Sequence, residues 1–383
     1  MELIPVLFLT ALLVGYFVLA GCDVGLGMLM PYLARTRGER RRAVSAAAPY
    51  FLGTEVWLVG AIGVVAGLFP ELKTAVVTGM WPVFSALLAG WLLRDAGLWF
   101  RARAEAPSWH GLWDAAIVGG SWTIAVCWGL VGGALLAGGT LASPFAAAVA
   151  ALVVVLFLLR GAAFGAERLV PPGREADDAD GPVGGDAVGG AAGSVGSVGT
   201  VPAARVAQTA VSADAAARLT RVLARAGLAV LAVAVLLGAF PGTLDGGLPL
   251  AAAAGAALVA VALAATAGTE GPGRSRHASA LAMGVMAPAV GVGAALPVEP
   301  VPGAVLTLVA VALAPVVPLM VVGQVALYRM LRRPASATGF FAQAAPAVGV
   351  GGGARTGAGR PAGISRFRPT AVGGPQGRES HGA

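Results

Sequence analysis

Residues 15–33 read GYFVLAGCDVGLGMLMPYL, residues 35–42 read RTRGERRR, and residues 45–58 read SAAAPYFLGTEVWL. An apolar segment that carries Asp23 is thus followed by a basic loop and by a second apolar segment that carries Glu55. Each acid lies roughly 18–20 Å from this loop when the intervening residues are counted along an α-helix. Both carboxyl groups are therefore expected at one membrane depth, where an ionisable side chain is costly and usually functional.

The composition is that of a membrane protein. Of the 383 residues, 57% are hydrophobic and only 12% are charged, whereas a soluble domain has about a quarter charged residues. The apolar runs are long and do not alternate every second residue, which favours helices over a transmembrane β-barrel. Abundant Ala, Gly and Val with a single lysine, Lys73, suggest a bacterial source. The sequence predicts an all-α polytopic protein of a bacterial cell membrane.

Nine membrane-spanning helices can be drawn from the apolar runs. They cover approximately residues 4–33, 45–69, 74–101, 111–137, 143–165, 220–240, 248–268, 278–297 and 303–331. The loops between them alternate between arginine-rich and arginine-free, and arginine-rich loops of membrane proteins face the cytoplasm. This pattern predicts the N-terminus outside and the C-terminus inside. Because the net charge of +7 is gathered in these short loops, it does not indicate nucleic-acid binding.

Changes in composition divide the chain into five parts. Residues 1–138 form the half that carries the motifs, expected to fold as a first four-helix bundle, and residues 139–170 form the fifth helix. Residues 171–216 are a low-complexity insertion placed in the cytoplasm. The remaining helices fall within residues 217–333, and residues 334–383 are a Gly/Pro/Ala/Arg tail predicted to be disordered.

Ionisable side chains inside the spans are concentrated in the N-terminal half. Asp23 and Glu55 are the candidates for a proton path, because acids within a membrane commonly serve proton transfer. The competing interpretation is that they balance Arg94 in a structural ion pair. Asp95 and Asp114 are further candidates for structural ion pairs. Because the C-terminal spans carry almost no ionisable side chain, any proton chemistry is expected in the first half.

The cysteines and histidines predict no cofactor site within this chain. Cys22 and Cys127 both fall inside predicted spans, which indicates neither a disulfide framework nor a metal cluster. The three histidines fall in a loop (His110), at a span end (His277) and in the tail (His381). Because a membrane haem usually takes axial ligands from span interiors, the chain alone is expected to bind no haem or metal and to hold no catalytic residue.

The first half resembles subunit II of the cytochrome bd-type quinol oxidases. The resemblance is carried by residues 21–27, which read GCDVGLG, by the arginine-rich loop, and by residues 55–58, which read EVWL. It continues through residues 94–101 and the Trp-Asp pair at 113–114, and it covers residues 10–138. The second half is similar only in its pattern of spans.

The resemblance implies an architecture and a set of partners. The nine spans would form two four-helix bundles and one peripheral helix. The partner would be subunit I, which carries haem b, haem d and the quinol site, in a heterodimer that can also hold a small third subunit. The complex would oxidise quinol and reduce dioxygen to water in contact with membrane lipid and quinone. Subunit II itself would hold no axial haem ligand and would contribute to proton access.

Three positions depart from the pattern of this family. Leu52 stands where the family usually has an acid associated with the proton path, and Ala20 stands where some members have another. Trp99 replaces an acid that is common in the third span. Asp23 remains, with Glu55 close to the lost position. The proton route is thus either rewired around Glu55, weakened or lost.

An alternative interpretation is a divergent membrane scaffold or transporter-like protein that kept the fold and lost the oxidase role. A transporter is expected to show broken helices and polar residues at the membrane midplane in both of its halves. The C-terminal half of this sequence has almost no such residues, which favours the oxidase subunit.

The arginine pattern makes a prediction about topology. A green fluorescent protein fused after Arg333 is expected to fluoresce, and an alkaline phosphatase fused there is expected to be inactive, because the positive-inside rule places this end in the cytoplasm. The matched control carries the same two reporters in the arginine-free loop at residues 138–144, where the opposite result is expected. An active phosphatase after Arg333 would contradict the predicted orientation.

Overall fold

The computed structural model describes residues 3–104, 106–169, 203–240, 249–268, 272–294, 296–301 and 303–331, and within them the regular secondary structure is entirely helical. The helices are α1 (Leu3–Leu33), α2 (Arg37–Leu68), α3 (Pro70–Leu72), η1 (Lys73–Thr78), α4 (Trp81–Phe100), η2 (Arg101–Arg103), α5 (Pro107–Leu136), α6 (Pro144–Arg168), α8 (Ala203–Gly238), α9 (Pro249–Ala267), α10 (Pro272–Gly293) and α11 (Gly303–Leu331). Among the described residues, seven helices are long and apolar enough to cross a membrane, namely α1, α2, α4, α5, α6, α8 and α9. The prediction of an all-α, multi-pass membrane protein is confirmed.

The two remaining long helices, α10 and α11, occupy the positions predicted for the eighth and ninth spans, and their assignment as spans stays a prediction. The boundary of α8 differs from the sequence expectation. This helix begins at Ala203, within the predicted insertion 171–216, because its alanine-rich start has a high helix propensity. The part that is apolar enough to cross a membrane begins at Val211. Residues 171–202 and the predicted tail 334–383 lie outside the described residues.

Prolines fix where many of the helices begin. Proline is the first residue of α5, α6, α9 and α10 (Pro107, Pro144, Pro249 and Pro272). The N–H of the first helical residue has no acceptor within the helix, so its absence in proline costs no hydrogen bond. The fixed φ of proline also suits a helix. The start of α6 is also capped by Ser143, whose hydroxyl accepts a hydrogen bond from the backbone N–H of Ala146 at 3.0 Å.

The basic loop after α1 is shorter than the sequence suggests. Thr36 caps α2, with its hydroxyl accepting from the Glu39 N–H at 3.3 Å and its own N–H donating to the Glu39 carboxylate at 2.9 Å. This reciprocal capping box starts the helix at Arg37 and places most of the loop's arginines on the first turns of α2. The third predicted span, residues 74–101, is divided in the structure. The π-helical segment η1 covers its start and ends at Thr78, and α4 begins at Trp81 with proline as its second residue.

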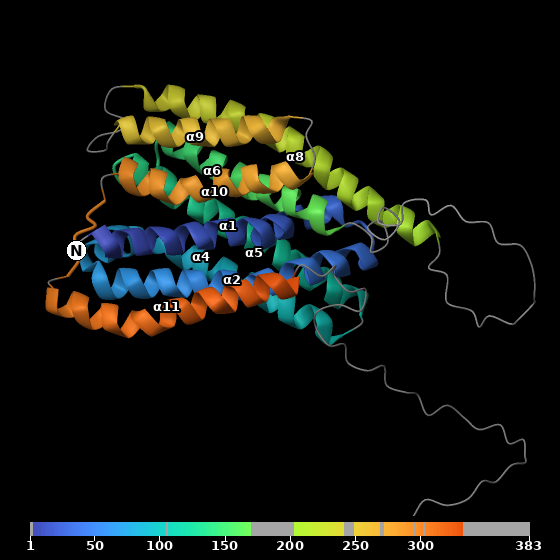
Figure 1. Ribbon diagram of the computed structural model, residues 1–383. Helices are drawn as coiled ribbons and strands as arrows, with labels where there is room; N and C mark the ends of the chain where they lie inside the picture. Colours follow the sequence, from blue (N-terminus) through green and yellow to red (C-terminus); the bar gives the residue numbers. More distant parts are fainter. Residues whose placement is uncertain are drawn as a thin grey trace, which may run out of the picture. The chain divides into compact units, whose positions relative to one another are not determined.

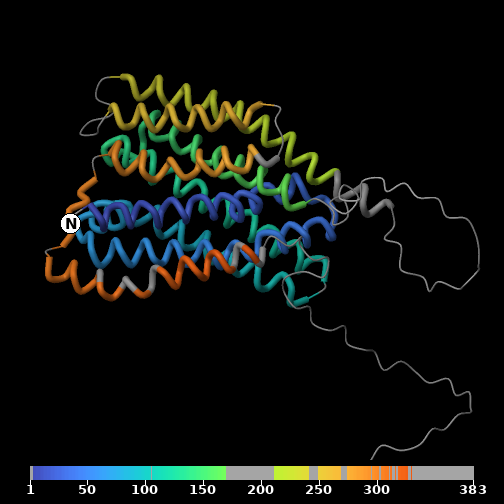
Figure 2. Tube along the Cα trace, in the orientation of Figure 1, coloured from blue at the N-terminus to red at the C-terminus, as the bar shows by residue number. Residues whose placement is uncertain are grey.

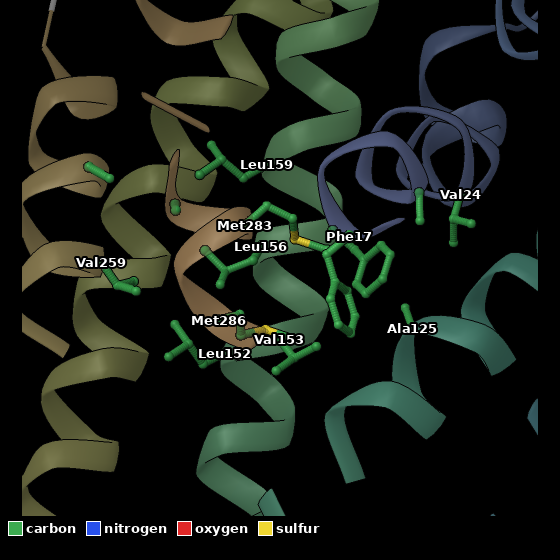
Figure 3. Packing of buried hydrophobic residues seen from close by; sticks show 14 of the residues in the cluster. Phe17, Val24, Ala125, Leu152, Val153, Leu156, Leu159, Val259, Met283 and Met286 are labelled. Atoms are coloured by element: carbon green, nitrogen blue, oxygen red, sulfur yellow. The ribbon is translucent and has the colours of Figure 1, made fainter. Parts of the chain in front are cut away.

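Helix α1 is in contact with most of the other helices. It packs against α2, α5, α6 and α10, so it lies between the helices of the first half and those of the second (Figure 1). The Cα trace follows the same arrangement, with α11 alongside α2 (Figure 2). The buried residues of the largest apolar cluster come from both halves. Figure 3 shows Met283 and Met286 of α10 beside Leu152 and Leu156 of α6, with Phe17 of α1 on the other side.

Glycines let α1 and α6 approach each other until their backbones touch. A Cβ atom on Gly25 would overlap the Phe157 carbonyl oxygen and lie 2.8 Å from the backbone nitrogen of Gly161. A Cβ on Gly161 would overlap the backbone of Gly25 in return. Such reciprocal contacts are how small residues pack helices in membranes. The same device joins α5 to α6, where a Cβ on Gly129 would lie 2.7 Å from the Ala150 carbonyl oxygen.

This contact makes the first prediction about stability. We expect Gly25→Ala to lower the free energy of unfolding by about 1–3 kcal/mol, because overpacking a close contact forces the backbones apart. Gly63→Ala in α2 is the matched control, since a Cβ there meets nothing within 4 Å. Unfolding in mixed detergent micelles, followed by circular dichroism, measures both variants. Equal stability of the two variants would contradict the proposed backbone contact.

Candidate functional site

Asp23 of α1 and Arg94 of α4 form an ion pair in the interior of the protein. The Arg94 Nη2 atom donates to the Asp23 Oδ2 atom at 2.8 Å. The Asp23 side chain is 0% exposed and the Arg94 side chain 3%. Bringing two charges out of water is costly, so a pair this deeply buried is stable only when its geometry is good and its other polar atoms are bonded.

Several further contacts hold the pair in place. The second carboxylate oxygen of Asp23 accepts a hydrogen bond from the backbone N–H of Val24 at 2.6 Å. The Arg94 guanidinium lies 5.9 Å from the centroid of the Phe51 ring in α2, a distance at which the ring face attracts a cation. The buried Nε of Arg94 has no hydrogen-bond partner among the described residues. Both carboxylate oxygens of Asp23 thus accept a hydrogen bond, whereas the Nε atom of Arg94 donates none within the described part of the chain.

Two further carboxyl groups extend this pair into a row. The Arg94 Nη1 atom donates to the Asp95 Oδ1 atom at 3.1 Å. Glu55 of α2 lines a cavity together with Asp23 and Arg94. Asp95 is 17% exposed, so the row leads from the fully buried Asp23 toward the surface. The sequence predicted a common depth for Asp23 and Glu55, and both acids line one cavity together with Arg94.

A small cavity lies beside this row. Its volume is about 20 Å³, which suffices for one water molecule. It is lined by Tyr16, Asp23, Val24, Phe51, Thr54, Glu55, Leu58, Trp91, Arg94 and Ile124. A second cavity of about 10 Å³ is also lined by Asp23 and Arg94, together with residues of α2, α4 and α5. Both predicted acids therefore face one cavity that has room for a water between polar groups.

Asp114 belongs to a separate cluster. Its carboxylate accepts from Arg40 of α2 at 3.1 Å and from the Arg101 side chain at the end of α4. Arg101 and Asp114 are buried, while Arg40 is 35% exposed. The cluster joins the starts of α2 and α5 to the end of α4. In the sequence, its two arginines contributed to the predicted topology and to the family resemblance, and neither was predicted to pair with Asp114.

Sequence reasoning assigned no structural or functional role to Arg160, the only charged residue in the interior of α6. Its side chain is buried and donates to backbone oxygens, from Nε to Val18 at 3.3 Å and from Nη1 to Arg276 at 2.7 Å. It therefore ties α6 to both α1 and α10. A lone arginine within an otherwise apolar span was the signal that could have identified it. Tyr16, which lines the cavity beside Asp23 and was also missed, accepts a hydrogen bond from the Trp128 indole at 2.8 Å.

The described residues do not fit a haem or a metal ion. They contain no group of three or more His, Cys, Asp or Glu side chains arranged to hold a metal ion. The two histidines in the described part of the chain, His110 and His277, lie in the first two turns of α5 and α10. An axial ligand for a membrane haem is instead expected from the interior of a span.

Comparison with known proteins bears on the first half of the chain. Residues 1–181 match the protein-family model described as "Cytochrome bd terminal oxidase subunit II". The chain is 33% identical over 132 residues to the "Cytochrome bd-I ubiquinol oxidase subunit 2" of Escherichia coli, covering 34% of this chain and 35% of that protein. It is 29% identical over 115 residues to the "Cytochrome bd ubiquinol oxidase subunit 2" of Bacillus subtilis, covering 30% and 34%.

The match to these curated relatives spans about a third of their length. It confirms the family resemblance that residues 10–138 predict. Both relatives are bacterial, and with the seven apolar helices this confirms the expected location in a bacterial cell membrane.

The Asp23–Arg94 pair makes a prediction about assembly. We expect Arg94→Met to destabilise the protein by about 3–5 kcal/mol, because it leaves buried carboxylates without their cation. Adding Asp23→Asn should restore part of the loss, since the double variant no longer buries that unpaired charge. Folded yield and detergent-induced unfolding measure both variants.

The matched control is Arg276→Gln, which removes an ion pair with Glu167 whose side chains are 34% and 30% exposed. A pair this exposed contributes only about 0–1 kcal/mol. If the double variant proved no more stable than Arg94→Met, the account of the buried pair would be wrong.

Proposed function

We propose that the protein is the subunit of a quinol oxidase that ligates no haem itself, because residues 1–181 match the model of the cytochrome bd terminal oxidase subunit II family. It assembles with a haem-bearing subunit I. The complex oxidises quinol in the membrane and reduces dioxygen to water. The observation that carries the proposal is the family match, which includes the buried Asp23–Arg94 pair and Glu55.

The position of the histidines supports assigning the haems to the partner. Since His110 and His277 lie near helix ends, this chain offers no histidine in the interior of a described span. The axial ligands of haem b and haem d are then supplied by subunit I. The contacts of this chain are with that subunit, with membrane lipid and quinone, and with a small third subunit where one is present.

Helix packing supports the proposal of nine spans in two bundles and a peripheral helix. In the first half, α1 packs on α2 and α5, and α4 packs on α5. In the second half, α6, α8, α9 and α10 contact one another in turn, as a second bundle requires. Helix α11 packs on α2, in keeping with a peripheral position. The arginine-rich ends favour an outside N-terminus and an inside C-terminus.

Within this complex, Asp23 and Glu55 provide proton access. Both line the cavity of about 20 Å³, which has room for a water that could carry a proton between polar groups. Reduction of dioxygen consumes protons, and a route past buried carboxyl groups would deliver them without exposing the interior to bulk water. The cavity is lined by helices of this chain, whereas the oxygen-reducing haem belongs to subunit I. The proton route must therefore continue from this chain into subunit I.

The proposal is tested on the complex co-expressed with the subunit I encoded beside it. The wild-type complex is expected to show haem b and haem d absorption bands, and this chain purified alone is expected to show none. Glu55→Gln should preserve assembly and haem content yet slow quinol-dependent oxygen consumption by on the order of a hundredfold, because an amide cannot carry a proton in its place.

Glu71→Gln is the matched control, since Glu71 is an exposed residue of α3 and should leave turnover unchanged. Full turnover with normal haem content in Glu55→Gln would show that protons enter elsewhere. A chain that purifies from its native membrane without any haem-bearing partner would favour the membrane scaffold instead.

A further inference from the structure

The start of α2 and the junction between α4 and α5 together form a basic surface at the end of the apolar spans. We propose that this surface binds the headgroup of an anionic phospholipid, and that the acyl chains of the lipid lie along the exposed apolar side chains beside it. The inference goes beyond the proposed function, because it assigns a lipid site to named residues and does not depend on the oxidase role.

The charge of this surface is strongly positive. Residues 35–42 and 101–114 carry seven arginines against three acids, a net charge of +4. One of these acids, Glu39, is already occupied, because its carboxylate accepts from the backbone N–H groups of Arg35 at 2.7 Å and Thr36 at 2.9 Å. The arginines are thus in excess, and basic pockets between helices at a membrane surface bind anionic headgroups.

Asp114 brings the two basic stretches together. Its carboxylate accepts from Arg40 of α2 at 3.1 Å and from the Arg101 side chain. One carboxylate cannot neutralise two guanidinium groups, so this cluster keeps a positive charge. The Arg101 side chain is only 9% exposed and holds the cluster in place, whereas the Arg40 side chain is 35% exposed and is accessible to a ligand. Arg103 of η2 is exposed as well.

Apolar side chains lie directly beside this charge. Trp99 and Phe100, the last two residues of α4, are 49% and 43% exposed, and Leu112 in the second turn of α5 is 60% exposed. The Phe100 ring centroid is 5.1 Å from that of Trp113, and the Trp109 indole donates to the Phe100 carbonyl oxygen at 2.7 Å. Tryptophan is enriched at the headgroup level of membranes. Because a free phosphate ion would make none of these apolar contacts, the surface favours a lipid.

The chemistry of the headgroup follows from the arginines. A guanidinium group donates two parallel hydrogen bonds to the oxygens of a phosphate, which makes arginine well suited to a phosphodiester. We assign the phosphate of the lipid to Arg40 and Arg103, the accessible arginines of the two stretches. A zwitterionic headgroup such as phosphocholine carries its own cation next to the phosphate, so its attraction to this surface is weaker.

The test is native mass spectrometry of the full-length protein, purified from its membrane with any subunit that it retains. The probes are phosphatidylglycerol and phosphatidylcholine with identical acyl chains, titrated separately. We expect the wild type to bind phosphatidylglycerol more tightly than phosphatidylcholine. Arg40→Gln and Arg103→Gln should each weaken phosphatidylglycerol binding by about fivefold, the effect of removing one arginine near an anionic lipid surface. Phosphatidylcholine binding should stay unchanged.

Lys73→Gln is the matched control. It also removes one exposed positive charge, but from η1, which precedes the start of α4 rather than following its end. Equal affinity of the wild type for the two lipids would overturn the proposal, because the contact would then be apolar only. A loss in Lys73→Gln as large as that in Arg103→Gln would overturn it too, because the effect would then reflect overall charge.

Inorganic phosphate, added at the same concentration as the lipid, distinguishes a lipid site from a site for a free anion. We expect it to leave the lipid bound, and displacement of phosphatidylglycerol would reject the lipid assignment. If Arg40→Gln does not fold, because Asp114 loses a partner, the exposed Arg103 decides the question alone. Binding that depends on these arginines supports the lipid site whether or not the protein takes part in dioxygen reduction.

Discussion

The ion pair between Asp23 and Arg94 constrains the structure around it. Charges in a membrane interior are stable only when they are paired and hydrogen-bonded, because the surroundings offer no water to replace a lost partner. The carboxylate is therefore bonded on both oxygens, and the guanidinium meets two carboxylates and a ring face. The pair thus links α1 to α4, and the Arg94 guanidinium also meets the Phe51 ring of α2, which packs on α1.

Close approach of the backbones allows so many helices to surround one charged row. Helix α1 touches α6 at Gly25, and α4 approaches α5 closely enough that a Cβ on Gly97 would lie 3.0 Å from the Trp113 carbonyl oxygen. Small residues at these crossings bring the helices together where membrane lipid gives no hydrophobic driving force. The charged residues and the glycines thus serve one arrangement, with polar contacts setting the register and small residues setting the spacing.

Much of this arrangement could be predicted from the sequence, because its signals are local. The apolar runs give the helices, and the equal spacing of Asp23 and Glu55 from one loop gives their common depth. The contacts across helices could not be predicted in the same way. That Arg94 meets both Asp23 and Phe51 depends on the rotation of α4 relative to α1 and α2, and that Arg160 donates to backbone oxygens of other helices depends on packing. The start of α2 was misjudged, because the arginines of residues 35–42 were taken to indicate a loop, whereas a capping box at Thr36 begins the helix at Arg37.

The exposure of Leu52 gives the missing acid a physical meaning. In the family that the first half resembles, an acid of the proton path usually stands at this position, and here its side chain is 43% exposed on the surface of α2. Glu55 lies three residues further, on the adjoining turn of the same side of the helix, and it faces the cavity beside Arg94. An acid at 52 would meet lipid or a partner subunit, whereas Glu55 faces a cavity that Arg94 also lines. The acid of this chain therefore lies one turn away from the family's position, at a cavity that it shares with a buried cation of the same chain.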